Sequence, residues 1–447
     1  MFALLTDLYE LTMMAGYYAA GMTGRATFDL YVRSLPPCRS YLVAAGLEQA
    51  LAYLEELRFE PDEIDYLRGL PSLAGVDRRF FDERLARFRF TGDVWAVPEG
   101  TPVFAGEPIV RVTAPLPEAQ LVETALLSIL MFQTSIATKA SRVVQAAAGR
   151  QVVEFGGRRA HGPEAAVHAA RAAFLAGCEA TSNVEAGYRF GIPLSGTMAH
   201  SWVMAHASEE EAFRRYSDLY PGRAVLLLDT YDTVSAARRI VASGLRPEAV
   251  RLDSGDIVPL SREVRAILDA GGLRETRLFV SGDLDEYRVA ELVRAGACVD
   301  GFGVGTALST SSDAPALSGV YKLAEVDRGG ASVPTQKLSA GKRTLPGRKQ
   351  VWRRVARDGV AAGDVVGLET EPALDGASPL LEPVMRAGRP VKPSESLEAL
   401  RHRAIASVGL LPAPLRRLDG PADYAVDVSP ALARLADRLA RAPARPV

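Results

Sequence analysis

The 447-residue sequence is poor in cysteine and has no excess of either charge. Its three cysteines, Cys38, Cys178 and Cys298, are widely spaced and odd in number, which fits neither a disulfide framework nor a zinc motif. A reducing cytoplasm is therefore the expected location. Lys and Arg total 52 against 54 Asp and Glu, so the formal net charge is −2. This balance provides no field for attracting nucleic acid or an anionic membrane, and any anionic ligand must be held by local groups.

Long apolar segments and common nucleotide-binding signatures are also missing. The most apolar stretches, such as ALLSILMF, are far too short to cross a bilayer. The N-terminal MFALLTDLYE has no basic segment and reaches Asp7 almost at once, so no signal peptide is expected. No Gly-x-x-x-x-Gly-Lys-Ser/Thr motif is present, which argues against a Walker-type ATPase.

The sequence does contain a regular alternation of short apolar segments with amphipathic ones. The apolar segments between residues 151 and 306 read QVVEFGG, RAVLLLDTYDT, AVRLDSGD, RLFVSGD and CVDGFGVGT. A strand, a loop and a helix repeated in this way are typical of parallel βα units. We predict a closed or nearly closed α/β barrel, with an open doubly wound sheet as the alternative. The strands are least distinct over 158–222.

The two ends of the chain follow other patterns. Short antiparallel strands are predicted over 92–115, and a long helical pattern begins near residue 118. From about residue 331 the sequence is richer in Arg, Pro and Gly. We therefore divide the chain into an N-terminal α+β domain (1–117), a barrel domain (118–330) and a C-terminal segment (331–447).

Aspartates follow three of the predicted barrel strands. Asp229 ends LLLD, Asp253 ends RLD and Asp283 ends VSGD. Active sites of α/β barrels form at the carboxyl ends of their strands, so these side chains are predicted to line one rim. Helix capping is the alternative, because Asp is a favoured N-cap residue.

Groups suited to an anionic, ring-containing substrate lie at the same strand ends. In GFGVGT, Gly303, Gly305 and Thr306 are predicted to bind a monophosphate through backbone N–H groups, because the Rossmann spacing is incomplete. In EFGGRRAHG, Phe155 and Arg158 would suit a flat acidic ring, although a core phenylalanine beside solvated arginines is the alternative. Together with carboxylates that can hold Mg²⁺ through water, these groups indicate a phosphorylated sugar.

Lys139 and Arg142 in TKASR lie three residues apart on one face of a predicted helix. Such a pair can contact a phosphate group. Solvation at the surface is the more common outcome for a pair of this kind.

Taken together, these segments resemble the motifs of nicotinate phosphoribosyltransferases, in the same order and over roughly residues 5 to 355. The matching segments are TDLYELTM, EFGGRRAHG, SGTMAHSWVMAH, LLLDTYDT, VRLDSGD, SGDLDEY, GFGVGTAL and KLSAGKRTLPGRKQVWR. The resemblance implies that nicotinate and 5-phosphoribosyl 1-diphosphate are joined to give nicotinate mononucleotide and diphosphate, in salvage biosynthesis of NAD. It also implies coupling to ATP hydrolysis through a phosphohistidine, with Mg²⁺ as cofactor. The implied fold is an irregular TIM-like barrel plus a smaller α+β domain built from both chain ends, in a homodimer with shared sites.

The resemblance also implies roles for individual residues. His200 in GTMAHS would be the phosphohistidine, and nicotinate would stack between Phe155 and a Tyr9 that reaches across the dimer. Arg158 would face the nicotinate carboxylate. The residues implied in binding the phosphoribosyl group are Asp229, Arg251, Asp253, Gly282, Asp283, Gly303 and Gly305. The basic segment 337–349 is similar to the family's phosphate-covering strip.

Histidine is a suitable residue for the implied phosphoryl transfer. A neutral imidazole is a nucleophile near physiological pH. Small residues before His200, among them Gly196 and Ala199, leave room for a phosphate group. A structural histidine is the alternative; that role is expected for His206, whereas His161 is expected to contact substrate.

Substrate choice and rival functions can also be weighed. Ser182 stands where the similar nicotinamide-using enzyme has an acidic residue, and its neutrality favours nicotinate, although Glu185 is close in sequence. The nearest rivals are enzymes that use nicotinamide or quinolinate. An aldolase-like or isomerase barrel is disfavoured because residues 223–306 contain no lysine. A non-catalytic sensor that binds the phosphoribosyl donor is a third alternative.

Overall fold

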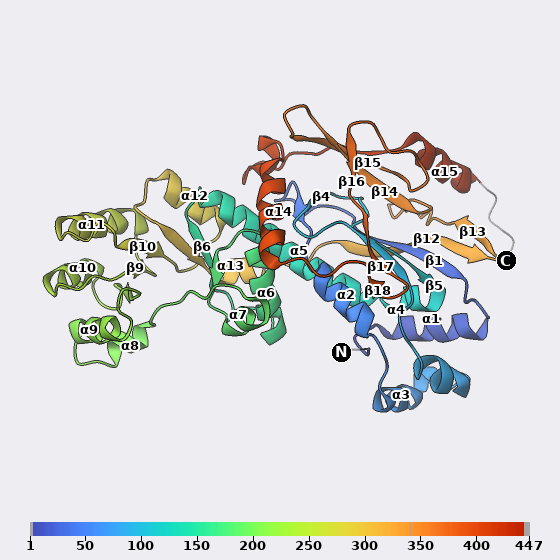
Figure 1. The fold of residues 1–447 in the computed structure, drawn as a ribbon, viewed down its shortest axis with the longest axis horizontal. Coiled ribbons are helices and arrows are strands. Elements are labelled where there is room, and N and C mark those ends of the chain that lie inside the picture. Colours follow the sequence, from blue (N-terminus) through green and yellow to red (C-terminus); the bar gives the residue numbers. More distant parts are fainter. Residues whose placement is uncertain (1–2, 340, 442–447) are drawn as a thin grey trace. The chain divides into compact units, whose positions relative to one another are not determined.

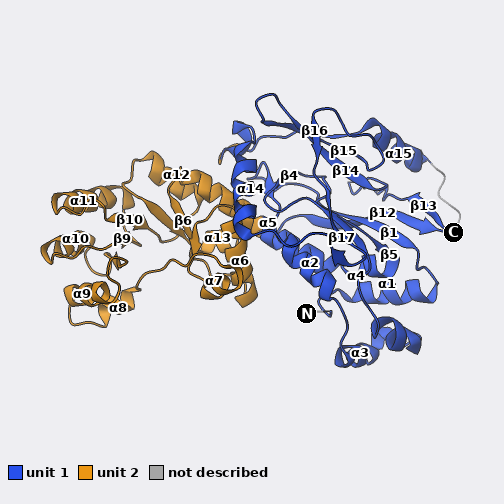
Figure 2. Ribbon diagram, in the orientation of Figure 1, with its two compact units in different colours: residues 1–134, 316–417, 421–447 blue, residues 135–315, 418–420 orange. Residues whose placement is uncertain are grey.

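The computed structural model describes residues 3–339 and 341–441, which fall into two compact units (Figures 1 and 2). Unit 1 comprises residues 1–134, 316–417 and 421–447, and unit 2 comprises 135–315 and 418–420. The compact units divide after residues 134 and 315, whereas the domain boundaries that we expect from the sequence lie after 117 and 330. The reason is that helix α5 (Glu123–Ala146) runs through the first boundary, while strand β12 (Gly319–Arg328) pairs with a strand of unit 1.

Unit 1 is built around a seven-stranded antiparallel sheet that combines strands from both parts of the chain. Its order is β13 (Ala331–Pro334), β12, β1 (Arg25–Val32), β5 (Val110–Pro115), β3 (Asp93–Ala96), β17 (Glu382–Arg386) and β18 (Arg389–Pro390). Strands β3 and β5 confirm the antiparallel strands predicted over 92–115. A four-stranded sheet contains β16 (Ala377–Pro379), β14 (Lys349–Val355), β15 (Ala361–Leu368) and β19 (Val426–Val428), and a small sheet pairs β2 (Leu42–Val43) with β4 (Pro102–Val103).

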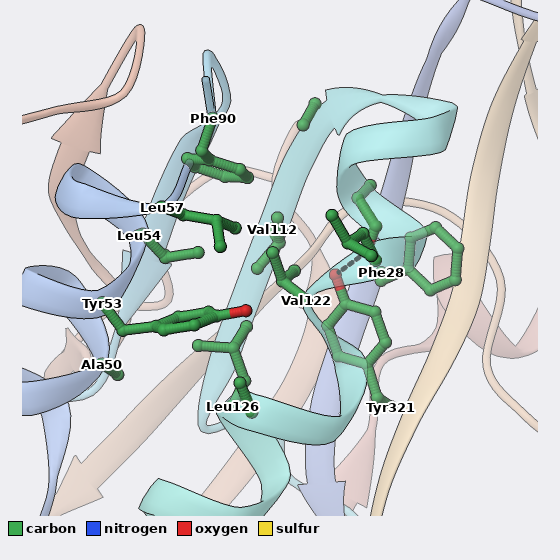
Figure 3. Close-up of a cluster of buried hydrophobic side chains, with 14 of the residues drawn as sticks. Phe28, Ala50, Tyr53, Leu54, Leu57, Phe90, Val112, Val122, Leu126 and Tyr321 are labelled. Carbon is green, nitrogen blue, oxygen red and sulfur yellow. Dashed lines mark hydrogen bonds between the residues drawn. The ribbon is translucent and has the colours of Figure 1, made fainter. Parts of the chain in front are cut away.

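The helices of unit 1 pack against its different sheets. They are α1 (Leu8–Ala19), α2 (Leu47–Glu56), α3 (Pro61–Arg68), α4 (Leu116–Leu121), α14 (Leu397–Gly409), α15 (Pro430–Arg441) and the short turns η1 (Pro71–Leu73), η2 (Phe80–Leu85) and η3 (Ala413–Arg416). Helix α15 packs on β15 of the four-stranded sheet, whereas α1 and α4 contribute to the core of the larger sheet. Within this core, the rings of Phe28 and Tyr321 stack 4.8 Å apart (Figure 3). The buried Tyr321 hydroxyl donates to the carbonyl of Ala119 at 2.7 Å, so its polar atom is satisfied.

Unit 2 confirms the predicted parallel βα units. Its six-stranded sheet is parallel throughout, in the order β7 (Ala180–Thr181), β6 (Gln151–Glu154), β11 (Gly301–Val304), β10 (Arg277–Val280), β9 (Ala249–Leu252) and β8 (Val225–Leu227). The intervening helices are α6 (Pro163–Leu175), α7 (Val184–Phe190), α8 (His200–Met204), α9 (Glu209–Leu219), α10 (Thr233–Ala242), α11 (Ile257–Ala270), α12 (Glu286–Arg294) and α13 (Thr306–Ser309). Helix α10 packs beside α11 and α9 (Figure 1).

This sheet forms a half-barrel whose edge strands are β7 and β8. No strand pairing joins these two edges within the part of the chain that the structure describes, so the closed TIM-like barrel stays a prediction. The loop 193–197 contacts both edges instead. Leu194 forms a parallel bridge with Thr181 of β7, and the Thr197 hydroxyl donates to the carbonyl of Val225 in β8 at 2.5 Å. The segment that leads to His200 is therefore anchored to both edge strands.

Among residues 3–339 and 341–441, no helix is both long enough and apolar enough to span a membrane.

Candidate active site

Three aspartates lie at the carboxyl ends of neighbouring strands of the half-barrel. Asp229 follows β8, Asp253 follows β9 and Asp283 follows β10. Helix capping, which was the alternative role, is performed by other aspartates. Asp232 caps α10 and Asp285 caps α12, each accepting a backbone N–H of the first turn. The three strand-end carboxylates thus do not cap these helices.

Asp229 links the loops that follow β8 and β9. Its Oδ2 accepts from the backbone N–H of Asp253 at 3.0 Å and from the Ser254 hydroxyl at 2.5 Å. Its Oδ1 is buried and has no hydrogen-bond partner among the described residues. A buried carboxylate oxygen without a hydrogen-bond donor has lost its hydration, which costs free energy unless a ligand or protein group donates to it. Asp229 therefore offers one acceptor to a ligand at the rim.

Asp253 is the centre of a charged network at the same rim. Its Oδ1 accepts from the guanidinium of Arg251 at 2.6 Å and from the hydroxyl of Ser281. The Nε of Arg251 also donates to the Ser281 hydroxyl at 2.7 Å. Burial alone would raise the pKa of Asp253, but the bond from Ser281 and the charge and bond of Arg251 together lower it. Asp253 is therefore an anion at neutral pH.

His200 is the first residue of α8 and lies beside this network. Its Nδ1 is 3.2 Å from the Thr230 hydroxyl, and its Nε2 is 3.9 Å from Oδ2 of Asp253. The side chain is 41% exposed. By contrast, Nδ1 of His206 is 2.7 Å from the carbonyl of Trp202, and the two rings pack against each other. The half-exposed imidazole is thus the one that faces the carboxylates.

Phe155 and Phe279 pack over strand β11 because two residues of that strand are glycines. A Cβ on Gly303 would lie 2.5 Å from the Phe155 ring, and a Cβ on Gly301 would lie 2.5 Å from the Phe279 ring. The guanidinium carbon of Arg251 is 5.7 Å from the centre of the Phe155 ring, within cation–π range. Besides the predicted anion binding, Gly303 therefore has a packing role that sequence reasoning missed.

The loops after β10 and β11 are neighbours because the two strands are paired. Gly282 has φ +92°, and a Cβ there would lie 2.0 Å from the carbonyl oxygen of Asp253, so only glycine fits. Asp283 also has a positive φ, of 43°. Gly305 precedes α13 and packs against the backbone of Phe155. The predicted phosphate-binding residues, including Thr306, therefore lie at the carboxyl ends of the neighbouring strands β10 and β11.

The remaining predicted site residues have other surroundings. Arg158 is exposed in the turn after β6. The ammonium of Lys139 is buried in unit 2, 2.6 Å from Glu286 and 2.8 Å from Asp313, so two carboxylates already neutralise it. Tyr9, 46% exposed, and the basic segment 337–349, described except for residue 340, belong to unit 1. The roles of these residues stay predictions.

Sequence reasoning missed three hydroxyl groups of the network. Ser281 connects Arg251 with Asp253, Thr230 contacts His200, and Ser254 donates to Asp229. Each lies within two residues of a strand-end aspartate, in SGD, DTY or DSG. A serine or threonine within two residues of each strand-end aspartate was the sequence signal that could have predicted these hydroxyl groups.

Residues 4–131 match the nicotinate phosphoribosyltransferase N-terminal domain, and residues 375–436 match the C-terminal domain of the same family. The chain is 46% identical to nicotinate phosphoribosyltransferase pncB2 of Mycobacterium tuberculosis, over 98% of this chain and 93% of that protein. The chain belongs to the nicotinate phosphoribosyltransferase family. The Bacillus subtilis nicotinate phosphoribosyltransferase is 42% identical over 83% of this chain and 77% of its own length.

Solved structures related to this nicotinate phosphoribosyltransferase family member share its fold. The human nicotinic acid phosphoribosyltransferase matches with a TM-score of 0.86 and 29% identity, over 97% of this chain and 99% of that one. The nicotinate-nucleotide pyrophosphorylase of Pyrococcus furiosus matches with a TM-score of 0.73 and 26% identity, over 91% and 95%. Residues 136–314 also match the quinolinate phosphoribosyl transferase C-terminal domain. That match coincides with unit 2, which contains the rim.

Proposed function

We propose that this protein joins nicotinate to 5-phosphoribosyl 1-diphosphate and releases nicotinate mononucleotide and diphosphate. The observation that carries the proposal is the strand-end network of Asp229, Arg251, Asp253 and Ser281 beside His200, in a chain of this family. The network combines ionised acceptors for sugar hydroxyls with a guanidinium above an aromatic ring. These are the groups that a phosphorylated pentose and a flat pyridine require.

The transfer replaces one bond at the anomeric carbon of ribose. The pyridine nitrogen attacks this carbon as the bond to the diphosphate oxygen breaks, and the electron pair of that bond leaves with diphosphate. The sugar then carries oxocarbenium character, as in glycoside cleavage. The anionic Asp253 and the unpartnered Oδ1 of Asp229 can orient hydroxyls and offset this positive charge. The pyridine nitrogen is already a nucleophile, so no strong base is needed.

ATP coupling is proposed to proceed through phosphorylation of His200. We propose the tautomer in which Nδ1 carries the proton and donates to the Thr230 hydroxyl, so that Nε2 keeps its lone pair and is the nucleophile. A bond forms between Nε2 and the γ-phosphorus of ATP as the bond to the β,γ-bridging oxygen breaks, and ADP leaves. Water later cleaves the N–P bond. The 41% exposure of the side chain supports access by ATP.

Mg²⁺ is proposed as the cation that accompanies the phosphate groups. No group of three or more His, Cys, Asp or Glu side chains suited to a metal occurs in residues 3–339 and 341–441. Mg²⁺ commonly needs only one or two carboxylates beside water and substrate phosphates, and Asp229 fits this role through its unpartnered Oδ1. When bound, the cation would neutralise charge on the leaving diphosphate.

The assembly is proposed to be a homodimer in which Tyr9 of one chain completes the pyridine site of the other. The exposed ring of Tyr9 in unit 1 supports this arrangement, since a large aromatic side chain in solvent is available for contact. The odd number and wide spacing of the three cysteines support the cytoplasmic location expected from the sequence.

Nicotinate is the proposed pyridine because the charges near the ring favour an acid. Ser182 is neutral, and the carboxylate of Glu185 is paired with the Nε of Arg189 at 2.7 Å. In assays with nicotinate, nicotinamide and quinolinate at equal concentrations, diphosphate release should be fastest with nicotinate. Faster turnover of nicotinamide or quinolinate would contradict the assignment. Binding of the donor without diphosphate release for any of the three would instead support the sensor alternative.

Arg158→Ala should weaken nicotinate binding selectively. The guanidinium is exposed after β6 and is proposed to pair with the nicotinate carboxylate. Loss of a charge-assisted hydrogen bond costs about 1.5–3 kcal/mol, so the KM for nicotinate should rise roughly 10- to 100-fold. The KM for the phosphoribosyl donor should change little, and steady-state kinetics with each substrate varied will show this. The neighbouring Arg159→Ala variant is the matched control, and equal effects on both KM values would place Arg158 elsewhere.

A further inference from the structure

A buried carboxyl group without a cation lies at the carboxyl end of β6. Glu154 is 1% exposed, and a donor faces each of its two oxygens. Oε1 accepts from the backbone N–H of Gly156, and Oε2 accepts from the hydroxyl of Thr181 at 2.6 Å. No Lys, Arg or His pairs with Glu154 among residues 3–339 and 341–441. Burying a carboxylate without a countercharge costs free energy, and these two bonds offset part of that cost.

Both contacts direct their protons at Glu154. The backbone N–H of Gly156 can only donate. The Thr181 hydroxyl accepts from the backbone N–H of Asn183 at 3.0 Å, which leaves its own proton for Oε2 of Glu154. Two acceptor oxygens, as in an ionised carboxylate, therefore satisfy both donors at once. Burial raises the pKa of the Glu154 carboxyl, and the bonds from Thr181 and Gly156 oppose this rise.

The bond from Gly156 holds the turn that carries Phe155 and Arg158. The carbonyl of Gly156 accepts from the backbone N–H of Arg159 at 2.8 Å and from the Ser309 hydroxyl at 3.2 Å. Both polar groups of Gly156 are thus fixed by hydrogen bonds, and Arg158 follows two residues later.

The bond from Thr181 holds a second loop at the same end of the sheet. Glu154 and Thr181 are direct partners in the parallel strands β6 and β7, which brings their side chains together. The backbone N–H of Ser182 donates to the carbonyl of Glu154 at 3.0 Å, and Asn183 caps α7 by accepting from the N–H of Ala186 at 3.0 Å. Glu154 therefore connects the turn after β6 with the loop after β7.

We propose that Glu154 is a positioning residue, whose two acceptor oxygens fix the turn after β6 and the loop after β7 so that Phe155 and Arg158 meet the pyridine ring and its carboxylate in one orientation. The buried side chain acts through these residues and not through contact with substrate. The proposal rests on the proposed function for the roles of Phe155 and Arg158. It adds that nicotinate binding depends on a buried hydrogen-bond acceptor, whereas binding of the phosphoribosyl donor does not.

Glu154→Leu is the decisive variant because it removes both acceptors while keeping a buried side chain of similar size. The KM for nicotinate should rise roughly 10- to 100-fold, the equilibrium effect of one or two hydrogen bonds. The KM for the phosphoribosyl donor and kcat should stay within about threefold of the wild type. Glu154→Gln keeps an acceptor for Gly156, so its KM for nicotinate should lie between those of the wild type and the leucine variant.

Three outcomes of these assays would overturn the proposal. The first is a wild-type KM for nicotinate in Glu154→Leu, and the second is an equal rise in both KM values. The third is a Glu154→Gln enzyme as impaired as Glu154→Leu, because the loss would then follow the charge and not the hydrogen bond from Gly156. If Glu154→Leu does not fold, Thr181→Val takes its place. It removes one bond, so the KM for nicotinate alone should rise roughly 3- to 10-fold.

Glu209→Leu is the matched control for a loss of stability. Glu209 is another buried carboxyl of unit 2, and its Oε2 accepts from Arg239 at 2.8 Å. Both leucine variants should melt at a lower temperature than the wild type. Only Glu154→Leu should change the KM for nicotinate. A similar change in Glu209→Leu would count against the proposal, because it would show a general effect of destabilisation.

Hydrogen exchange gives a readout that needs no turnover. The amide of Gly156 is protected by its bond to Glu154, so residues 155–160 should exchange faster in Glu154→Leu than in the wild type, Glu154→Gln or Glu209→Leu. Faster exchange together with no turnover of nicotinate would support the fastening of this turn and refute the proposed function. Unchanged exchange of residues 155–160 in Glu154→Leu would contradict the positioning role.

Discussion

Replacing His200 with alanine should abolish the stimulation of phosphoribosyl transfer by ATP while leaving a slow, ATP-independent transfer. The imidazole is the group that faces both Thr230 and Asp253, and alanine removes the only nitrogen to which the γ-phosphoryl group is proposed to move. The groups that bind the pentose and the pyridine remain. The ratio of diphosphate-release rates with and without ATP should therefore fall to about one.

His206→Ala is the matched control for this experiment. His206 lies in the same segment, but its Nδ1 contacts the carbonyl of Trp202 and its ring packs on that side chain. ATP stimulation should survive in this variant, although its thermal stability will fall. A His200→Ala enzyme that ATP still accelerates as strongly as the wild type would contradict the assignment.

Replacing Asp253 with asparagine should reduce kcat/KM for the phosphoribosyl donor on the order of 10²- to 10³-fold, the usual result of removing one electrostatic stabiliser from an active site. The lowered pKa of Asp253 keeps it ionised at neutral pH, so the variant loses a full negative charge. Arg251 and Ser281 then lose a charged acceptor, while the isosteric amide preserves the shape of the loop. Steady-state kinetics and a thermal melt will separate loss of catalysis from loss of fold.

Asp232→Asn provides the control at the same rim of the half-barrel. Asp232 caps α10 through its side chain, and asparagine caps a helix about as well as aspartate. The control should retain kcat/KM within about threefold of the wild type. An Asp253→Asn variant that performs as well as this control would show that the network has no catalytic part.

The parallel architecture of unit 2 was predictable because β8, β9 and β10 are mainly apolar runs, each followed within three residues by an aspartate. The edges of this sheet were less predictable, because β7 is only two residues long and Ala180–Thr181 carries no periodic signal. The loop 193–197 contacts both edge strands through one bridge and one hydroxyl bond, and neither leaves a pattern in the sequence. The compact units divide within α5, and helical periodicity does not show that this helix contributes to both of them.

The aspartates and His200 were identifiable from their motifs, but their partners were not. Arg251 meets Ser281 because β9 and β10 are paired in register, which places residues 30 positions apart side by side. Lys139 shows the converse limit. Its three-residue spacing from Arg142 correctly indicated a shared helical face, but spacing alone does not reveal that this face is buried against Glu286.

The most direct test follows ³²P from γ-labelled ATP in purified wild-type and His200→Ala protein, with and without nicotinate, 5-phosphoribosyl 1-diphosphate and Mg²⁺. We expect acid-labile label on the wild type that maps to the peptide containing His200. This label should be discharged as nicotinate mononucleotide forms, and it should be absent from the variant. Label that persists on His200→Ala, or a complete reaction mixture that never yields a pyridine ribotide, would contradict the account.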